Sequence, residues 1–222
     1  MKYIHHNLGL GDHIIYNGIV REYAKSGKIG LFCKKHNIPS VRFMYRDIDV
    51  EIIDSRDMEN INGDYLRLEF TGTAPVGYSG AFNDIFYEMV GIDPAKKWEL
   101  FHIERDLELE GLIFSKYEVE PFEYVFVHDR IKGHPSIAIE GVRPIVGLTD
   151  NIFGYCKLIE MAKEVHCVSS SFLWITEMMF PDKDGLFFHP TDRESDEINT
   201  PNLSKGWTWI GKPNYNTVRK RR

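Results

Sequence analysis

In the first third of the chain, short continuous runs of apolar residues alternate with segments in which apolar residues recur every three or four positions. Ile15, Ile19 and Tyr23 recur at helical spacing, and the segment 37–45, with Pro39 near its start, predicts a second short helix. Strands that alternate with helices favour a mostly parallel sheet with right-handed crossovers. The continuous runs predict strands that begin at Tyr3 and span residues 29–33, 50–54 and 65–70.

The middle of the chain is helical and then acidic. Residues 82–90 repeat apolar side chains at three and four, and Gly91 ends that helix. Asp93-Pro94 then opens a turn or short helix, and the acidic stretch 104–110 is expected to be a solvated face. We place the boundary between two halves here, so that residues 1–115 form one half and residues 116–222 the other.

A second series of strands and helices follows this boundary. Asp150 or Asn151 is expected to cap a helix, residues 172–180 predict another, and Trp207 and Trp209 are expected to anchor a polar tail. The fold class is therefore α/β, with two Rossmann-like halves and mostly parallel sheets. The strands predicted in the second half span residues 124–127, 136–139, 144–148, 165–168 and 186–189.

A glycine-rich turn follows the first apolar run. Gly9 and Gly11 permit a tight strand-to-helix turn, and Asp12 is placed to cap the helix. Backbone N–H groups at such a turn, together with the helix dipole, suit an anionic or hydroxyl-rich ligand. The turn lacks the third glycine of the dinucleotide fingerprint, which disfavours a nicotinamide cofactor.

Two further polar groups stand at the ends of apolar strands in the second half. His128-Asp129-Arg130 follows one strand, and Ser169-Ser170-Ser171 follows another and precedes a helix. A guanidinium fork matches two phosphate oxygens, and serine hydroxyls with helical N–H groups suit a second phosphate. The alternatives are that Arg130 pairs with a surface acid and that a serine is only a helix cap.

Composition narrows the classes of function. The chain of 222 residues is 43% hydrophobic, enough for a substantial core, and its net charge of -6 argues against nucleic acid as a partner. Three separated cysteines give no disulfide framework and are expected to be near the core. His5, His6 and His13 lie near the first turn without the spacing of a zinc site, so no metal is expected. No run approaches the ~20 apolar residues of a membrane span, and no signal peptide is evident, so a cytoplasmic protein is expected.

These motifs resemble glycosyltransferases of the two-Rossmann (GT-B) class. The turn from Gly9 to His13 is similar to that of the heptosyltransferase-like and fucosyltransferase-like families, and residues 127–130 are similar to the His-x-Arg strand end of fucosyltransferases. Residues 158–172 are similar to the late helix, strand and serine turn that hold nucleotide phosphates and ribose in such enzymes. The resemblance implies a cleft between the two halves, residues 1–115 on the acceptor side and residues 116–222 binding the nucleotide-sugar.

The resemblance also implies the reaction. A sugar would pass from a nucleoside-diphosphate donor to a hydroxyl of a glycan or lipid-linked acceptor, with no metal and no further cofactor. Gly9, Gly11, Arg130 and the three serines would bind phosphate and nucleotide, and His128 would orient the phosphate or acceptor, or satisfy a backbone carbonyl. Asp12 is either the base that takes the acceptor's proton or a helix cap, and His13 is the substitute base. His189, at another strand end, is expected to be structural.

Two alternatives stay open. The chain is short for the GT-B class, so a catalytically silent protein that binds a nucleotide-sugar or a glycan is the first. The second is a Rossmann-like enzyme with a nicotinamide or other phosphorylated cofactor. The sequence does not specify the sugar, the base, the acceptor or the oligomeric state.

Overall fold

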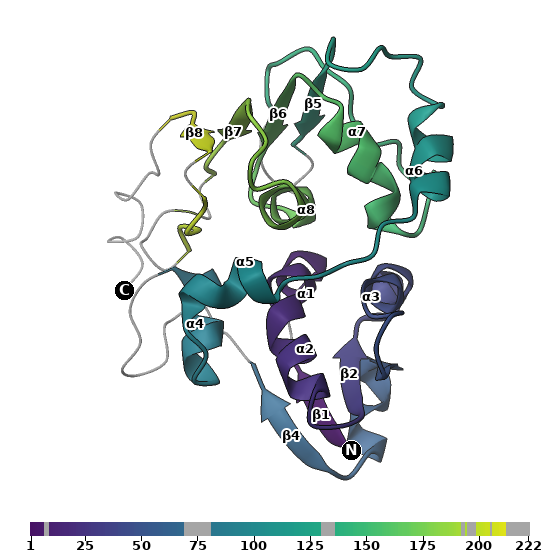
Figure 1. Ribbon diagram of the computed structural model, residues 1–222, viewed down its shortest axis with the longest axis vertical. Coiled ribbons are helices and arrows are strands. Elements are labelled where there is room, and N and C mark those ends of the chain that lie inside the picture. Colours follow the sequence, from purple (N-terminus) through teal and green to yellow (C-terminus); the bar gives the residue numbers. More distant parts are fainter. Residues whose placement is uncertain are drawn as a thin grey trace. The chain divides into compact units, whose positions relative to one another are not determined.

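The computed structural model describes residues 1–6, 9–68, 81–129, 136–191, 194, 199–204 and 206–211. The chain divides into two compact units, residues 1–104 and residues 105–222 (Figure 1). Each unit carries a four-stranded sheet in which every pairing is parallel. The α/β class with two Rossmann-like halves is therefore confirmed. The helix from Leu107 to Phe114, which the expected boundary at residue 115 would leave in the first half, belongs to the second unit.

The sheet of the first unit has its first strand inside rather than at an edge. The order is β3-β2-β1-β4, so β1 pairs with β2 on one side and with β4 on the other. The four predicted strands are confirmed, although Leu68 lies outside the last of them and Glu69 and Phe70 lie outside the described residues. The strands are β1 (Lys2–His5), β2 (Ile29–Cys33), β3 (Val50–Asp54) and β4 (Asp64–Arg67).

Helices of the first unit pack closely around Gly18. A Cβ atom at this position would lie 2.8 Å from both the Cβ of Leu100 and the hydroxyl of Tyr87, so only glycine lets these elements approach. The Tyr87 hydroxyl also donates a 2.8 Å hydrogen bond to the carbonyl of Ile15. The helices are α1 (Leu10–Ile15), α2 (Asn17–Ala24), α3 (Ile38–Met44), α4 (Phe82–Met89) and α5 (Lys97–Leu100), with short 3-10 helices η1 (Lys35–Asn37), η2 (Ser55–Asn60) and η3 (Pro94–Lys96).

The strands of the second unit stand in the sheet in chain order, β5-β6-β7-β8. Asn151 caps η4 by accepting a hydrogen bond from Phe153 N, as the sequence predicts. The elements are α6 (Leu107–Phe114), β5 (Val125–His128), η4 (Ile152–Tyr155), α7 (Cys156–Glu160), β6 (Glu164–Cys167), α8 (Ser171–Met179), β7 (Leu186–Phe188) and β8 (Trp207–Trp209).

Two predicted strands of the second unit are wrong. Residues 136–139 and 144–148 form no strand, and this part of the chain contributes only an isolated bridge between Val142 and Phe126. Ile137 instead packs against Val127 and Val168. Ile137 and Ile139 therefore pack against side chains of the sheet rather than extend its hydrogen-bond ladder, whereas Ile145 and Val146 are exposed.

The acidic stretch is not simply a solvated face. Asp106 caps α6 by accepting a hydrogen bond from Leu109 N, and Glu110 is 1% exposed. Arg105 Nε donates to Glu110 Oε1 at 3.0 Å, and Arg105 Nη1 donates to Glu160 Oε1 at 2.9 Å. The two carboxylates raise the pKa of Arg105, so this guanidinium is a permanent cation that holds α6 against α7.

The polar tail is anchored as predicted, although strand β8 was not predicted. Trp207 is 7% exposed, and its Nε1 donates a 2.7 Å hydrogen bond to Oε2 of Glu177, which is fully buried in α8. Trp209 packs edge-on against Phe188. Cys33, Cys156 and Cys167 are buried and free, as expected. Within the described ranges, no helix has the length and apolar character needed to cross a membrane.

Candidate functional site

The glycine-rich turn lies at the carboxyl end of β1. Gly9 is the N-cap of α1, and Asp12, two residues into the helix from Leu10, directs its carboxylate back so that Oδ2 accepts a 2.8 Å hydrogen bond from Gly9 N. The predicted capping role of Asp12 is thus met from the first turn of the helix rather than from the N-cap position. Gly9, Gly11 and Asp12 are all half-buried, so this end of β1 is accessible from solvent.

His13 points away from solvent and toward another histidine. It is 2% exposed, and its Nδ1 lies 3.1 Å from Nε2 of His6, which is 5% exposed. Burial, with a smaller contribution from the charge of Lys34, lowers the pKa of His13 to about 3. Burial, followed by the charge of His13, also lowers the pKa of His6 well below its ordinary value. Both rings are neutral near pH 7, which makes His13 a weak proton acceptor.

A second group of predicted residues meets at the carboxyl edge of the second sheet. His128 ends β5 in register with Cys167 of β6, and Val168 N donates to the carbonyl of His128 at 3.1 Å. The ring of His128 lies over Phe172 of α8, with centroids 4.4 Å apart. The structure therefore brings His128 and the serines 169–171 together, because neighbouring parallel strands end at the same edge.

Ser170 is the N-cap of α8, but its side chain does not perform the usual capping role. Its backbone is extended, and its Oγ makes no cap hydrogen bond. This Oγ is shielded from solvent and has no hydrogen-bond partner among the residues that the structure describes. A buried hydroxyl without a partner costs about 1–3 kcal/mol, so a ligand that bonds to it recovers this energy. The first turn of α8 also presents the unbonded N–H groups that every helix start carries.

Asp129 and Arg143 form an ion pair beside these strand ends. Asp129 is 4% exposed, and its Oδ2 accepts hydrogen bonds from Ile137 N at 3.0 Å and Arg143 Nη2 at 3.1 Å. Burial opposes ionisation of Asp129, but the hydrogen bonds and charge of Arg143 outweigh it and lower the pKa of the carboxyl. Sequence reasoning missed Arg143. An acid that directly follows a buried strand needs a cation, and this was the available signal.

Arg130 and His189 are the remaining predicted residues. Arg130 lies outside the described residues. His189 follows β7, and its Nε2 lies 2.9 Å from Nδ1 of His166, whose Nε2 lies 3.2 Å from Glu164 Oε2. Burial and the neighbouring His166 lower the pKa of His189 to about 4. In the parts of the chain that the structure describes, no three His, Cys, Asp or Glu side chains are grouped to hold a metal ion.

The sequence matches no family model and no curated protein. Among solved structures, the fold is similar to the crystal structure of the glycosyl transferase family 9 from Veillonella parvula DSM 2008. The TM-score is 0.62 at 9% sequence identity, with 94% of this chain and 86% of that chain covered. The likeness confirms that the fold is one adopted by a glycosyltransferase. The closer resemblance to heptosyltransferase-like and fucosyltransferase-like families stays a prediction.

Proposed function

We propose that the protein is a glycosyltransferase that moves a sugar from a nucleoside-diphosphate donor to a hydroxyl of a glycan or lipid-linked acceptor, without a metal. Two Rossmann-like units and a fold similar to that of a glycosyl transferase support this function. The observation that carries it lies at the start of α8, beside His128, where the hydroxyl of Ser170 has no hydrogen-bond partner in the described part of the chain.

The donor's diphosphate binds, in this proposal, at the start of α8. A helix N-terminus offers N–H groups and the positive end of a dipole, and three consecutive serines add hydroxyls to it. Phosphate oxygens would accept a hydrogen bond from Ser170 Oγ, which among the described residues bonds to nothing else. His128 borders the same edge and would contact the phosphate or the transferred sugar.

The charge that develops during sugar transfer explains why these groups would be enough for catalysis without a metal. Negative charge gathers on the leaving diphosphate as the glycosidic bond breaks, and the sugar acquires oxocarbenium character. Hydrogen-bond donors that are already oriented toward the diphosphate stabilise this transition state without reorganisation. The start of α8, with the serines and Arg130, would supply the positive potential that a metal provides in other enzymes.

Asp12 is the proposed base that accepts the acceptor's proton. Asp12 is half-buried at the carboxyl end of β1, whereas His13 is buried and its pKa is lowered to about 3, which makes His13 a poor base. The hydrogen bond from Gly9 N and the dipole of α1 stabilise the Asp12 anion and limit its basicity. Asp12 would therefore take the proton late, as the bond to the sugar forms.

Calorimetric titration of the full chain with UDP, GDP, ADP and CDP, each in the presence of EDTA, tests the donor site. We expect one of them to bind, and Ser170→Ala to weaken that binding at least about tenfold, because a hydrogen bond to a charged group is worth about 1.5–3 kcal/mol. Ser115→Ala is the matched control, since Ser115 is an exposed serine whose Oγ donates to Leu112 O in α6.

Two results would contradict the proposal: no nucleoside diphosphate binds, or Ser170→Ala binds as tightly as the wild type. Binding of NAD instead would support the nicotinamide alternative. Donor binding without sugar transfer to any acceptor would support the catalytically silent binding protein.

A further inference from the structure

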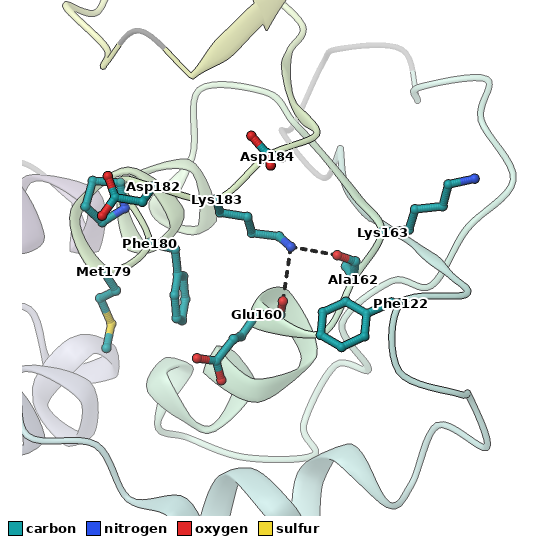
Figure 2. A pocket seen from close by; sticks show the side chains of 10 residues that line it. Phe122, Glu160, Ala162, Lys163, Met179, Phe180, Asp182, Lys183 and Asp184 are labelled. Atoms are coloured by element: carbon teal, nitrogen blue, oxygen red, sulfur yellow. Dashed lines mark hydrogen bonds between the residues drawn. The ribbon is translucent and has the colours of Figure 1, made fainter.

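The second unit contains a pocket of about 580 Å³ that none of the candidate site residues lines (Figure 2). Ala162 and Lys163 line it immediately before β6, and Lys183 and Asp184 line it shortly before β7. The pocket therefore lies at the amino ends of these strands, whereas Ser169 follows the carboxyl end of β6. Ser169 lies six positions after Lys163, a span of at most about 20 Å. The volume falls within the roughly 300–1,000 Å³ typical of small-ligand sites.

Two phenylalanines form the apolar part of the pocket. Phe180 follows α8, and Phe122 lies three residues before β5. Figure 2 shows their rings on either side of the Glu160 and Lys183 side chains. Phe122 is 60% exposed and has a positive φ of 64°, a backbone conformation that is costly for a bulky residue. The backbone here is held by a 2.7 Å hydrogen bond from Phe122 N to Met161 O, so a strained turn presents an aromatic ring to solvent at the pocket.

The charged groups of the pocket balance one another. Lys183 Nζ donates to the carbonyls of Glu160 at 3.0 Å and Ala162 at 2.6 Å, across the end of α7. The Glu160 carboxylate is bound by Arg105. The other ionic side chains among the described lining residues are two lysines, Lys163 and Lys183, and two acids, Asp182 and Asp184. This arrangement disfavours a strongly anionic or strongly cationic ligand.

We propose that this pocket binds a neutral saccharide. A pyranose ring has an apolar C–H face that packs against an aromatic ring, and hydroxyls at its edge that both donate and accept hydrogen bonds. Phe122 and Phe180 provide the aromatic surface, and Asp182, Asp184 and Lys163 form a polar rim, with side chains that Figure 2 shows directed away from the two rings. A neutral ligand with one apolar face and a polar rim is the chemistry that matches all three features: the aromatic pair, the mixed donors and acceptors, and the balanced charge.

This saccharide is distinct from the donor sugar. The pocket lies at the amino ends of the strands, whereas the donor sugar would bind beside the diphosphate at their carboxyl ends. We therefore infer that it holds a second sugar unit of a glycan acceptor or product, a step that rests on the proposed function. Saccharide binding itself does not depend on that step.

Saturation-transfer NMR on the full chain with glucose, galactose, mannose and N-acetylglucosamine tests the site, together with amide chemical shifts of the protein. We expect at least one sugar to bind and to shift the amides of Phe122, Lys163 and Asp184. Phe122→Asn should weaken that binding about tenfold, the equivalent of about 1.4 kcal/mol. Asparagine tolerates positive φ, so this substitution removes the ring without adding strain. Leu112→Asn, at a residue of α6 that is 57% exposed and outside the pocket, is the matched control.

The proposal is overturned if none of the four sugars binds, or if Phe122→Asn and the wild type bind the sugar equally. Adding the nucleoside diphosphate identified by calorimetry distinguishes this site from the donor site. A sugar that stays bound at saturating nucleotide occupies a separate site. If the nucleotide displaces the sugar, the sugar binds at the donor site and the inference is wrong. Sugar binding without any nucleotide binding would leave this site intact and refute the proposed transferase.

Discussion

The Nε2 atom of His6 lies 3.1 Å from the Nδ1 atom of His13, and this contact closes the chain across the glycine-rich turn that carries Asp12. One ring donates and the other accepts, which requires that at least one of the two imidazoles be neutral. Both side chains are buried, and burial is the main cause of their lowered pKa values. The geometry of the turn is therefore coupled to the protonation of two histidines.

This coupling predicts a loss of stability in acid. The pKa of His13 is lowered to about 3 in the folded chain, against 6.5 for its ordinary value, so the unfolded chain binds a proton more readily. The stability from this group is fully present above pH 6.5 and is lost as the pH falls from 6.5 toward 3. We expect up to about 1.4 kcal/mol of unfolding free energy to be lost per pH unit for each such histidine.

Urea unfolding from pH 7 to pH 4 measures this slope. His13→Gln should be less stable than the wild type at pH 7 and should show a shallower pH dependence, because one titrating group is gone. His36→Gln, at an exposed histidine, is the control and should preserve the slope. Equal slopes for the wild type and His13→Gln would show that the His6–His13 pair does not set the acid limit.

Asp12→Asn should separate binding from turnover. The amide oxygen of asparagine can still accept the hydrogen bond from Gly9 N, so α1 should keep its start. We expect sugar transfer to fall at least about 100-fold, as is typical for loss of a general base, with the donor's dissociation constant unchanged. Asp106→Asn is the control, because Asp106 makes a similar cap bond to Leu109 N. Undiminished transfer by Asp12→Asn would remove Asp12 as the base.

Arg105→Met should destabilise the second unit. The substitution leaves Glu110, which is 1% exposed, without its guanidinium partner. We expect a loss of about 3 kcal/mol in urea unfolding, typical of an uncompensated buried charge. The double variant Arg105→Met, Glu110→Leu should recover most of this loss, since it removes the charge as well. If the double variant is no more stable than Arg105→Met, then lost packing rather than the buried charge explains the effect.

Gly185→Ala and Gly91→Ala form a matched pair. Both glycines have positive φ, 71° and 73°, but a Cβ at Gly185 would lie 2.6 Å from the carbonyl oxygen of Lys163, whereas Gly91 faces open space. We expect Gly91→Ala to cost about 1 kcal/mol from the left-handed backbone alone. Gly185→Ala should cost about 2 kcal/mol more, because the clash must be relieved by moving the backbone before β6. Thermal unfolding of both variants checks the difference, and similar losses would refute the steric argument.

Sequence patterning identified strands where apolar runs are buried on both faces. All five residues of β2 are buried, and their continuous apolar run gave the strand directly. The same reasoning failed for residues 136–139. Ile137 and Ile139 pack their side chains against the sheet, but their backbone does not pair with a strand of it. It missed β8 because a three-residue strand is too short to show a period.

The residues of the candidate site were predictable to a similar extent. His128 and the serines 169–171 share an edge because parallel strands end together, which the order of the elements already implied. The basic partners of the buried carboxylates Asp129 and Glu110 were not predictable. The position of Asp129 after a buried strand signals that it needs a cation, but it does not indicate that Arg143, 14 residues away, supplies it. The acidic stretch likewise does not indicate that Arg105 pairs with Glu110. The functional roles of the site residues stay predictions.

The strand order of the second sheet has a consequence for biosynthesis. Since β5, β6, β7 and β8 lie in the order in which the ribosome releases them, each new strand meets a finished neighbour. The first sheet differs, because β1 waits for β4, about sixty residues later, before its second edge is paired. During synthesis, the second sheet can therefore grow by adding one strand at a time to the same edge. The last of these strands, β8, is held by the hydrogen bond from Trp207 to Glu177.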